Sequence, residues 1–94
     1  MAIGIEATKL MTYNAAKMKK DGQRHTREAA MVKVFGAEHA VHCALECIQI
    51  TGGLGYSKEH PGDQLLRDAK LLEIGEGSRD VLRTLIGKSV LSGK

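Results

Sequence analysis

The chain is poor in aromatic residues and proline, and each scarcity narrows the range of possible structures. Aromatics make up 3% of its 94 residues, tryptophan is absent, and Pro61 is the single proline. A core without large rings has to be built from aliphatic side chains, methionine and alanine, which suits helices packed on helices. Because one proline can break only one helix, long helices are allowed over most of the chain.

Cysteine is also scarce, and long apolar runs are absent. The two cysteines, Cys43 and Cys47, lie four apart in a segment that we predict to be helical. Their side chains are then roughly parallel, which is poor disulfide geometry and favours a reducing compartment. No apolar run approaches the ~20 residues that span a bilayer, and we see no signal peptide. We expect no membrane contact and a cytoplasmic location, or the mitochondrial matrix in a eukaryote.

The remaining composition is that of one globular domain. It is 43% hydrophobic and 27% charged with a net charge of +3, and its length predicts a single domain over residues 1–94. Basic residues gather near position 20: Lys17, Lys19, Lys20, Arg24 and Arg27. No aromatic residue interleaves with them, and a helix C-terminus favours such charges, so we predict no nucleic-acid partner.

Hydrophobic periodicity predicts an all-α fold, a bundle of three to four up-and-down helices. The predicted helices cover about residues 2–20, 26–50, 62–74 and 78–91, and Thr26 is the expected N-cap of the second. That second helix carries two apolar strips, so it should lie between other helices. The strips are Ala30, Val34, Ala37, Val41, Leu45 and Ile48, and then Met31, Phe35, Ala40, Cys43 and Cys47.

Two patterns suggest ligands but have simpler explanations. His39, Cys43 and Cys47 follow one another at steps of four, yet one helix rarely wraps a metal ion, so we predict no metal site. The stretch QITGGLGY, residues 49–56, has three glycines in four residues. A helix C-cap explains Gly52 or Gly53, whereas exposed amides close to a pyrophosphate would explain the surplus. Spacing alone leaves both interpretations open.

Glu76 lies between Gly75 and Gly77 where the last two predicted helices meet. The simple interpretation is a helix start, because negative charge suits the helix N-terminus. The alternative is a catalytic base on a pliable joint.

Five segments follow one another along the chain: REAAMVKVF, QITGGLGY, KEHP, LLRDAK and IGEGS. Taken in this order, they resemble the acyl-CoA dehydrogenase family over nearly the whole chain. The resemblance implies the later part of that family's C-terminal helical domain. It implies a homo-oligomeric flavoenzyme that oxidises acyl-CoA to trans-2-enoyl-CoA by α-proton abstraction and β-hydride transfer to FAD. An electron-transfer protein would be the acceptor.

The resemblance also implies roles for individual residues. Glu76 would be the catalytic base and its backbone N–H would hold the thioester carbonyl, with Gly77 beside the substrate. The positions implied to approach FAD are Gln49, Gly52, Gly53, Ser78 and Asp80.

The sequence departs from the family pattern at one position, and one alternative function also has to be considered. Gly75 replaces an aromatic residue that often precedes the glutamate, which would alter the acyl pocket. The 94-residue chain alone is expected to be inactive, since the resemblance assigns most of the site to other domains. The alternative is a freestanding, non-catalytic helical module that serves self-association.

Overall fold

The computed structural model describes residues 1–93, and helices make up most of them. They are α1 (Ala2–Lys20), α2 (Thr26–Thr51), α3 (Gly53–Tyr56), α4 (Gly62–Ile74) and α5 (Arg79–Ser92). No described helix is long and apolar enough to cross a membrane. The all-α bundle predicted from periodicity is confirmed.

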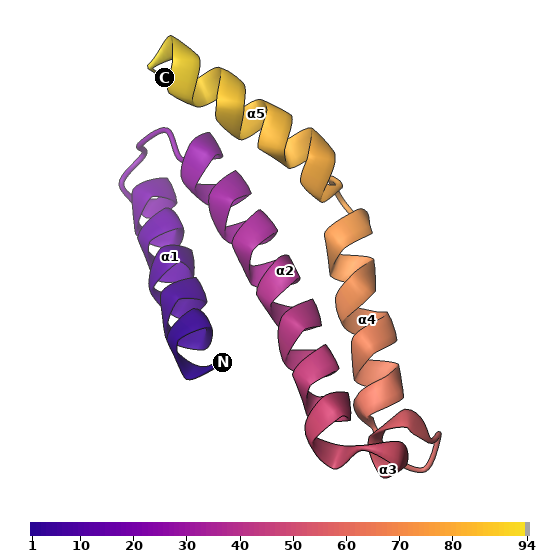
Figure 1. Ribbon diagram of the computed structural model, residues 1–94. Coiled ribbons are helices and arrows are strands. Elements are labelled where there is room, and N and C mark those ends of the chain that lie inside the picture. The colour runs from indigo at the N-terminus through magenta and orange to yellow at the C-terminus, as the bar shows by residue number, and fades with distance from the viewer. Residues whose placement is uncertain (94) are drawn as a thin grey trace.

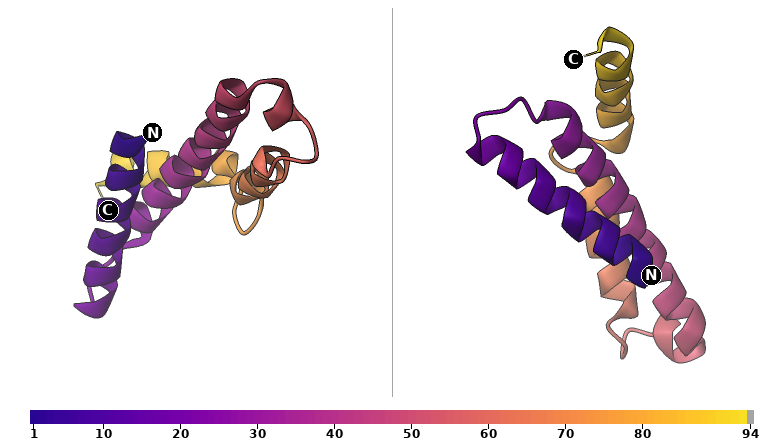
Figure 2. Two further views of the ribbon diagram at one scale, coloured as in Figure 1. Left: turned by 90° about the horizontal axis from the view of Figure 1, so that it is seen from below. Right: turned by 90° about the vertical axis from the view of Figure 1, so that its left-hand side faces the viewer.

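Helix α2 is the centre of the arrangement, as its two apolar strips predict. It contacts all four other helices, with α1 on one side and α4 on the other (Figures 1 and 2). α4 runs back along the C-terminal half of α2, and α5 continues toward the N-terminal end of α2 (Figure 1). The joint between α4 and α5 therefore lies beside the middle of α2.

Two details of the predicted helices differ in the structure. Thr26 is the first helical residue of α2, and His25 occupies the N-cap position without a capping side-chain bond. The His25 ring lies 3.2 Å from the Gln23 carbonyl instead. The one-turn helix α3 was not predicted, because Gly53 and Gly55 have low helix propensity.

Alanine dominates the buried part of the core. The buried hydrophobic residues are Ala15, Ala30, Ala37, Ala44 and Ala69, and none of the large side chains in residues 1–93 is fully buried. The radius of gyration is 15.6 Å, whereas a compact domain of this length has about 12 Å. The described part of the chain is thus an elongated layer of helices whose larger apolar residues stay partly exposed.

A groove of about 610 Å³ follows α2 between α1 and α4. Its lining includes Ile5 of α1, Ala40, Cys43 and Cys47 of α2, and Leu65 of α4. Three of the five residues of the second apolar strip of α2, Ala40, Cys43 and Cys47, therefore face an open groove and not a packed core.

α1 approaches α2 closely through glycine. The His39 ring of α2 lies over Gly4, and its Nε2 is 3.0 Å from the Met1 carbonyl oxygen. Phe35 stacks on the same ring with 6.0 Å between centroids. A Cβ on Gly4 would overlap the imidazole, so this contact requires a glycine at position 4.

We expect Gly4→Ala to lower the free energy of unfolding by about 1 to 3 kcal/mol, because the added methyl displaces the His39 ring. Urea denaturation followed by circular dichroism measures this. Gly87→Ala is the control: nothing lies within 4 Å of a Cβ there, so it should stabilise α5 by about 0.5 to 1 kcal/mol. Equal stability of Gly4→Ala and the wild type would contradict the close contact.

Candidate site at the joint between α4 and α5

The joint from Gly75 to Ser78 contains the one described non-glycine residue with a positive φ. Gly75 is extended, at φ −75° and ψ 146°, and its N–H donates to the Leu71 carbonyl at 2.7 Å. Glu76 then has φ 51° and Gly77 has φ 101°. The left-handed region costs an L-residue roughly 1 to 2 kcal/mol. The strained position is Glu76 itself, and Gly75 has a φ that any residue adopts.

The side chain of Glu76 is free to meet a ligand. The residue is exposed, and no hydrogen bond or ion pair joins its carboxylate to a described residue. Its backbone N–H likewise donates to none of residues 1–93. A carboxylate and an unpaired amide of the same residue are therefore both available at the joint.

Ser78 forms the N-terminal cap of α5. Its hydroxyl oxygen accepts from the Val81 N–H at 3.4 Å, and Asp80 supplies the negative charge of the first helical turn. Because these two residues fulfil the needs of a helix start, Glu76 is not required for capping. This weakens the interpretation of Glu76 as a helix start.

Ion pairs enclose the joint on the side of α2. The Glu73 carboxylate, with 4% of its side chain exposed, lies 3.0 Å from Lys70 Nζ and 3.4 Å from Arg79 Nη1. Arg79 also lies 3.9 Å from Glu38 Oε1 of α2, which Arg83 binds as well. We call Lys70, Glu73, Arg79, Glu38 and Arg83 the joint cluster.

The sequence reasoning missed this cluster, although one signal was present. Glu73 follows Gly62, Leu66 and Ala69 on the face of α4 that is turned toward α2, and two of these three are buried. An acid on an otherwise buried face needs charged partners, and Lys70 lies three residues away. Outside this cluster, the sequence also did not indicate the contact in which Lys33 donates to the Leu72 carbonyl near the end of α4 at 2.6 Å.

The second set of predicted residues lies at the other end of α4. Gly52 ends α2 with φ 66°, which confirms its role as a C-cap, and Gly53 begins α3. Nothing lies within 4 Å of a Cβ on either glycine, and Gln49 is exposed in the last turn of α2. Their backbone is open to close approach by a ligand.

The structure therefore brings the predicted residues together in two groups. Glu76, Gly77, Ser78 and Asp80 share the joint, whereas Gln49, Gly52 and Gly53 share the turn between α2 and α3. α4 separates the groups (Figure 1), and its 13 residues span about 20 Å. The two groups therefore lie at opposite ends of α4 and do not form one compact site.

In the described part of the chain, no group of three residues that could hold a metal ion forms around His39, Cys43 and Cys47 of α2. Cys43 Sγ lies 3.4 Å from His39 Nε2, the same nitrogen that faces the Met1 carbonyl at 3.0 Å. A carbonyl can only accept, so the contact with Met1 requires the form of the ring in which Nε2 carries a hydrogen.

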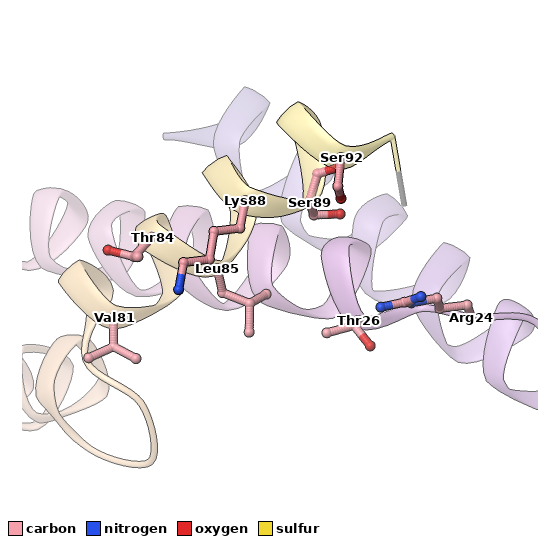
Figure 3. Close-up of a pocket in the computed structure, with 8 residues that line it drawn as sticks. All are labelled: Arg24, Thr26, Val81, Thr84, Leu85, Lys88, Ser89 and Ser92. Atoms are coloured by element: carbon pink, nitrogen blue, oxygen red, sulfur yellow. The ribbon is translucent and has the colours of Figure 1, made fainter.

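A pocket of about 600 Å³ lies between the start of α2 and α5 (Figure 3). Val81 and Leu85 give it an apolar side, and Arg24 and Lys88 contribute charge. The Lys88 and Arg24 side chains lie apart, with Leu85 and Thr26 between them (Figure 3). None of the predicted site residues lines this pocket.

Comparison with known proteins gives a consistent result. The family model described as "Acyl-CoA dehydrogenase, C-terminal domain" matches residues 1–91. An acyl-CoA dehydrogenase of Bacillus subtilis (strain 168) is 42% identical over 93 residues, which cover 99% of this chain and 24% of that protein.

Solved structures show the same relation. Butyryl-CoA dehydrogenase from Megasphaera elsdenii superposes with a TM-score of 0.92 at 37% identity, over 97% of this chain and 24% of its own. A chain in the structure titled for the electron transferring flavoprotein of Acidaminococcus fermentans gives 0.92 at 35% identity, with the same coverage. The chain thus spans about a quarter of the length of the proteins it matches.

We expect Glu76→Asn to raise the free energy of unfolding by up to about 1 kcal/mol, because asparagine tolerates the left-handed region better than glutamate. Thermal and urea denaturation measure the change. Glu59→Asn is the control, since Glu59 is another exposed acid in a turn but has no positive φ. A loss of stability at position 76 that matches or exceeds the loss at position 59 would argue against strain at Glu76.

Proposed function

The chain belongs to the acyl-CoA dehydrogenase family, and we propose that it forms the C-terminal helical part of a flavin-dependent enzyme that oxidises acyl-CoA to trans-2-enoyl-CoA. The observation that carries this proposal is Glu76, an exposed and unpaired carboxylate held at φ 51°. Strained residues of this kind concentrate at functional sites. The rest of the enzyme would come from polypeptide beyond these 94 residues.

Glu76 would act on the substrate through two of its groups. Its carboxylate accepts the proton from the α-carbon of the thioester, as a positioned general base. Its unpaired N–H donates to the thioester carbonyl oxygen, where negative charge develops as the proton leaves. Gly77 follows with φ 101°, a backbone shape that glycine adopts readily and residues with a side chain rarely do.

FAD, when bound, supplies the acceptor for the hydride of the β-carbon. The residues of this chain fit such a group as edge contacts: Gly52 and Gly53 present open backbone, and Gln49 is exposed beside them. Ser78 and Asp80 lie next to Glu76. Since α4 separates the two groups, we propose that each group contacts FAD of a different subunit of a homo-oligomer. An isolated chain would then hold too little of the site to be active.

The partners follow from the same proposal. Acyl-CoA would be the substrate, and a separate electron-transfer protein would receive the electrons. The likeness to a chain from the A. fermentans electron transferring flavoprotein structure supports the second partner.

In the full-length enzyme, we expect Glu76→Gln to slow flavin reduction by acyl-CoA about 10²- to 10⁴-fold, because the amide cannot accept the α-proton. Acyl-CoA binding should persist, since the backbone N–H is unchanged. Glu76→Asp should be intermediate, because the shorter side chain misplaces the carboxylate. Stopped-flow absorbance of the flavin measures the rate, and Glu59→Gln serves as the matched control. A wild-type rate in Glu76→Gln would place the base elsewhere.

The groove along α2 favours a second candidate, a freestanding module that serves self-association without catalysis. Its apolar lining between α1 and α4 is open, and the described core buries only alanine among its hydrophobic residues. A contiguous apolar surface of this kind marks an interface. The two candidates differ in whether the reading frame continues upstream of Met1 through further domains.

Both candidates predict that the 94-residue chain self-associates, because a second copy would cover the open groove. Sedimentation velocity across a concentration series should show a mass that rises above the monomer. Ala40→Glu places a charge in the groove and should shift the equilibrium toward monomer, whereas Lys58→Glu, on the exposed turn after α3, should leave it unchanged. Strictly monomeric behaviour at high concentration would exclude this interface.

A further inference from the structure

Glu73 is the described acid that is most deeply buried, and its place is electrostatically unfavourable. It lies in the last turn of α4 with 4% of its side chain exposed. Negative charge is disfavoured at a helix C-terminus, and a buried carboxylate needs cationic partners. Its position therefore depends on Lys70 and Arg79.

These two partners are not equivalent. Lys70 lies on α4 one turn before Glu73, so it adds no constraint between helices. Arg79 is the first residue of α5, and its contact at 3.4 Å joins the two ends of the joint. The five residues that this contact encloses, 74 to 78, include Glu76 near their middle.

Arg79 also fixes the joint against α2. Its Nη1 lies 3.4 Å from Glu73 Oε2 and 3.9 Å from Glu38 Oε1, so one guanidinium nitrogen faces carboxylates of two helices. Arg83 binds Glu38 as well, but no hydrogen bond or ion pair joins it to Glu73. Within residues 1–93, Arg79 thus joins α4, α5 and α2 at one point.

We propose that Arg79 is a positioning residue: its bridge between Glu73 and Glu38 sets the angle of the joint and thereby holds Glu76 in the left-handed conformation. A residue at φ 51° returns to a relaxed φ unless its surroundings prevent it. The short connection between Glu73 and Arg79 leaves residues 74 to 78 little freedom to do so. The importance of Arg79 for catalysis rests on the proposed function, whereas its effect on the conformation of Glu76 does not.

The test is nuclear magnetic resonance of the 94-residue chain, at a concentration where the spectrum is sharp. A positive φ brings the amide proton of Glu76 close to its own Hα and gives a strong intraresidue cross-peak. Arg79→Ser should weaken this cross-peak to the level of helical residues. It should also speed hydrogen exchange at least tenfold for the Gly75 N–H, which donates to Leu71.

Arg83→Ser is the matched control, because it removes an arginine of the same helix that binds only Glu38 among these acids. It should leave the Glu76 cross-peak unchanged. Arg79→Lys keeps the charge but loses the planar guanidinium that can serve two carboxylates, so it should give an intermediate cross-peak. If Arg79→Ser unfolds the chain, Arg79→Lys decides the matter.

An unchanged Glu76 cross-peak in folded Arg79→Ser, or in Arg79→Lys where the serine variant unfolds, overturns the proposal. An equal change of the Glu76 cross-peak in Arg83→Ser also overturns the proposal, because loss of any arginine of the joint cluster would then have the same effect. The measurement needs neither flavin nor acyl-CoA, so its failure is distinct from a failure of Glu76→Gln to slow the enzyme.

Discussion

Close approach of helices to α2 through small side chains is the constraint on which the other features depend. Ala30, Ala37 and Ala44 are buried at intervals of seven residues, so they lie along one face of the helix with a slow drift around its axis. Methyl groups allow neighbouring backbones to come near, and Gly4 allows the same for α1 under His39. Larger side chains are pushed to the flanks of these contacts, where they line the groove and remain partly exposed.

This arrangement explains how the joint acquires its geometry. α4 and α5 divide the length of α2 between them, so the chain has to change direction beside the middle of α2. Lys33 and Glu38, both on α2, make contacts at this point: Lys33 donates to the Leu72 carbonyl and Glu38 faces Arg79. The segments on both sides of the strained residue are thus held by contacts from α2.

The sequence predicted the longer helices well, since their apolar periodicity is local information. It failed for α3, where Tyr56 and Ser57 donate to the carbonyls of Gly52 and Gly53 and form a turn against propensity. The family motif singled out Glu76, whose role stays a prediction, but did not indicate that Glu76 takes a positive φ together with Gly77. The joint cluster could not be predicted in full, because Arg79 and Glu38 are far apart in sequence and meet only through tertiary packing.

The separation of the two groups of site residues by α4 has a consequence for how this segment can change. An α-helix turns by about 100° and advances 1.5 Å per residue. One residue inserted between Gly62 and Ile74 would therefore rotate Glu73 away from Arg79 and displace Glu76 relative to Gly53, even if every inserted atom lay in solvent. Exposed positions of α4, such as Arg67 and Asp68, are free to vary in identity, but the number of residues in α4 is not. The length of α4 therefore constrains the relative placement of the two groups more than the identity of its exposed residues does.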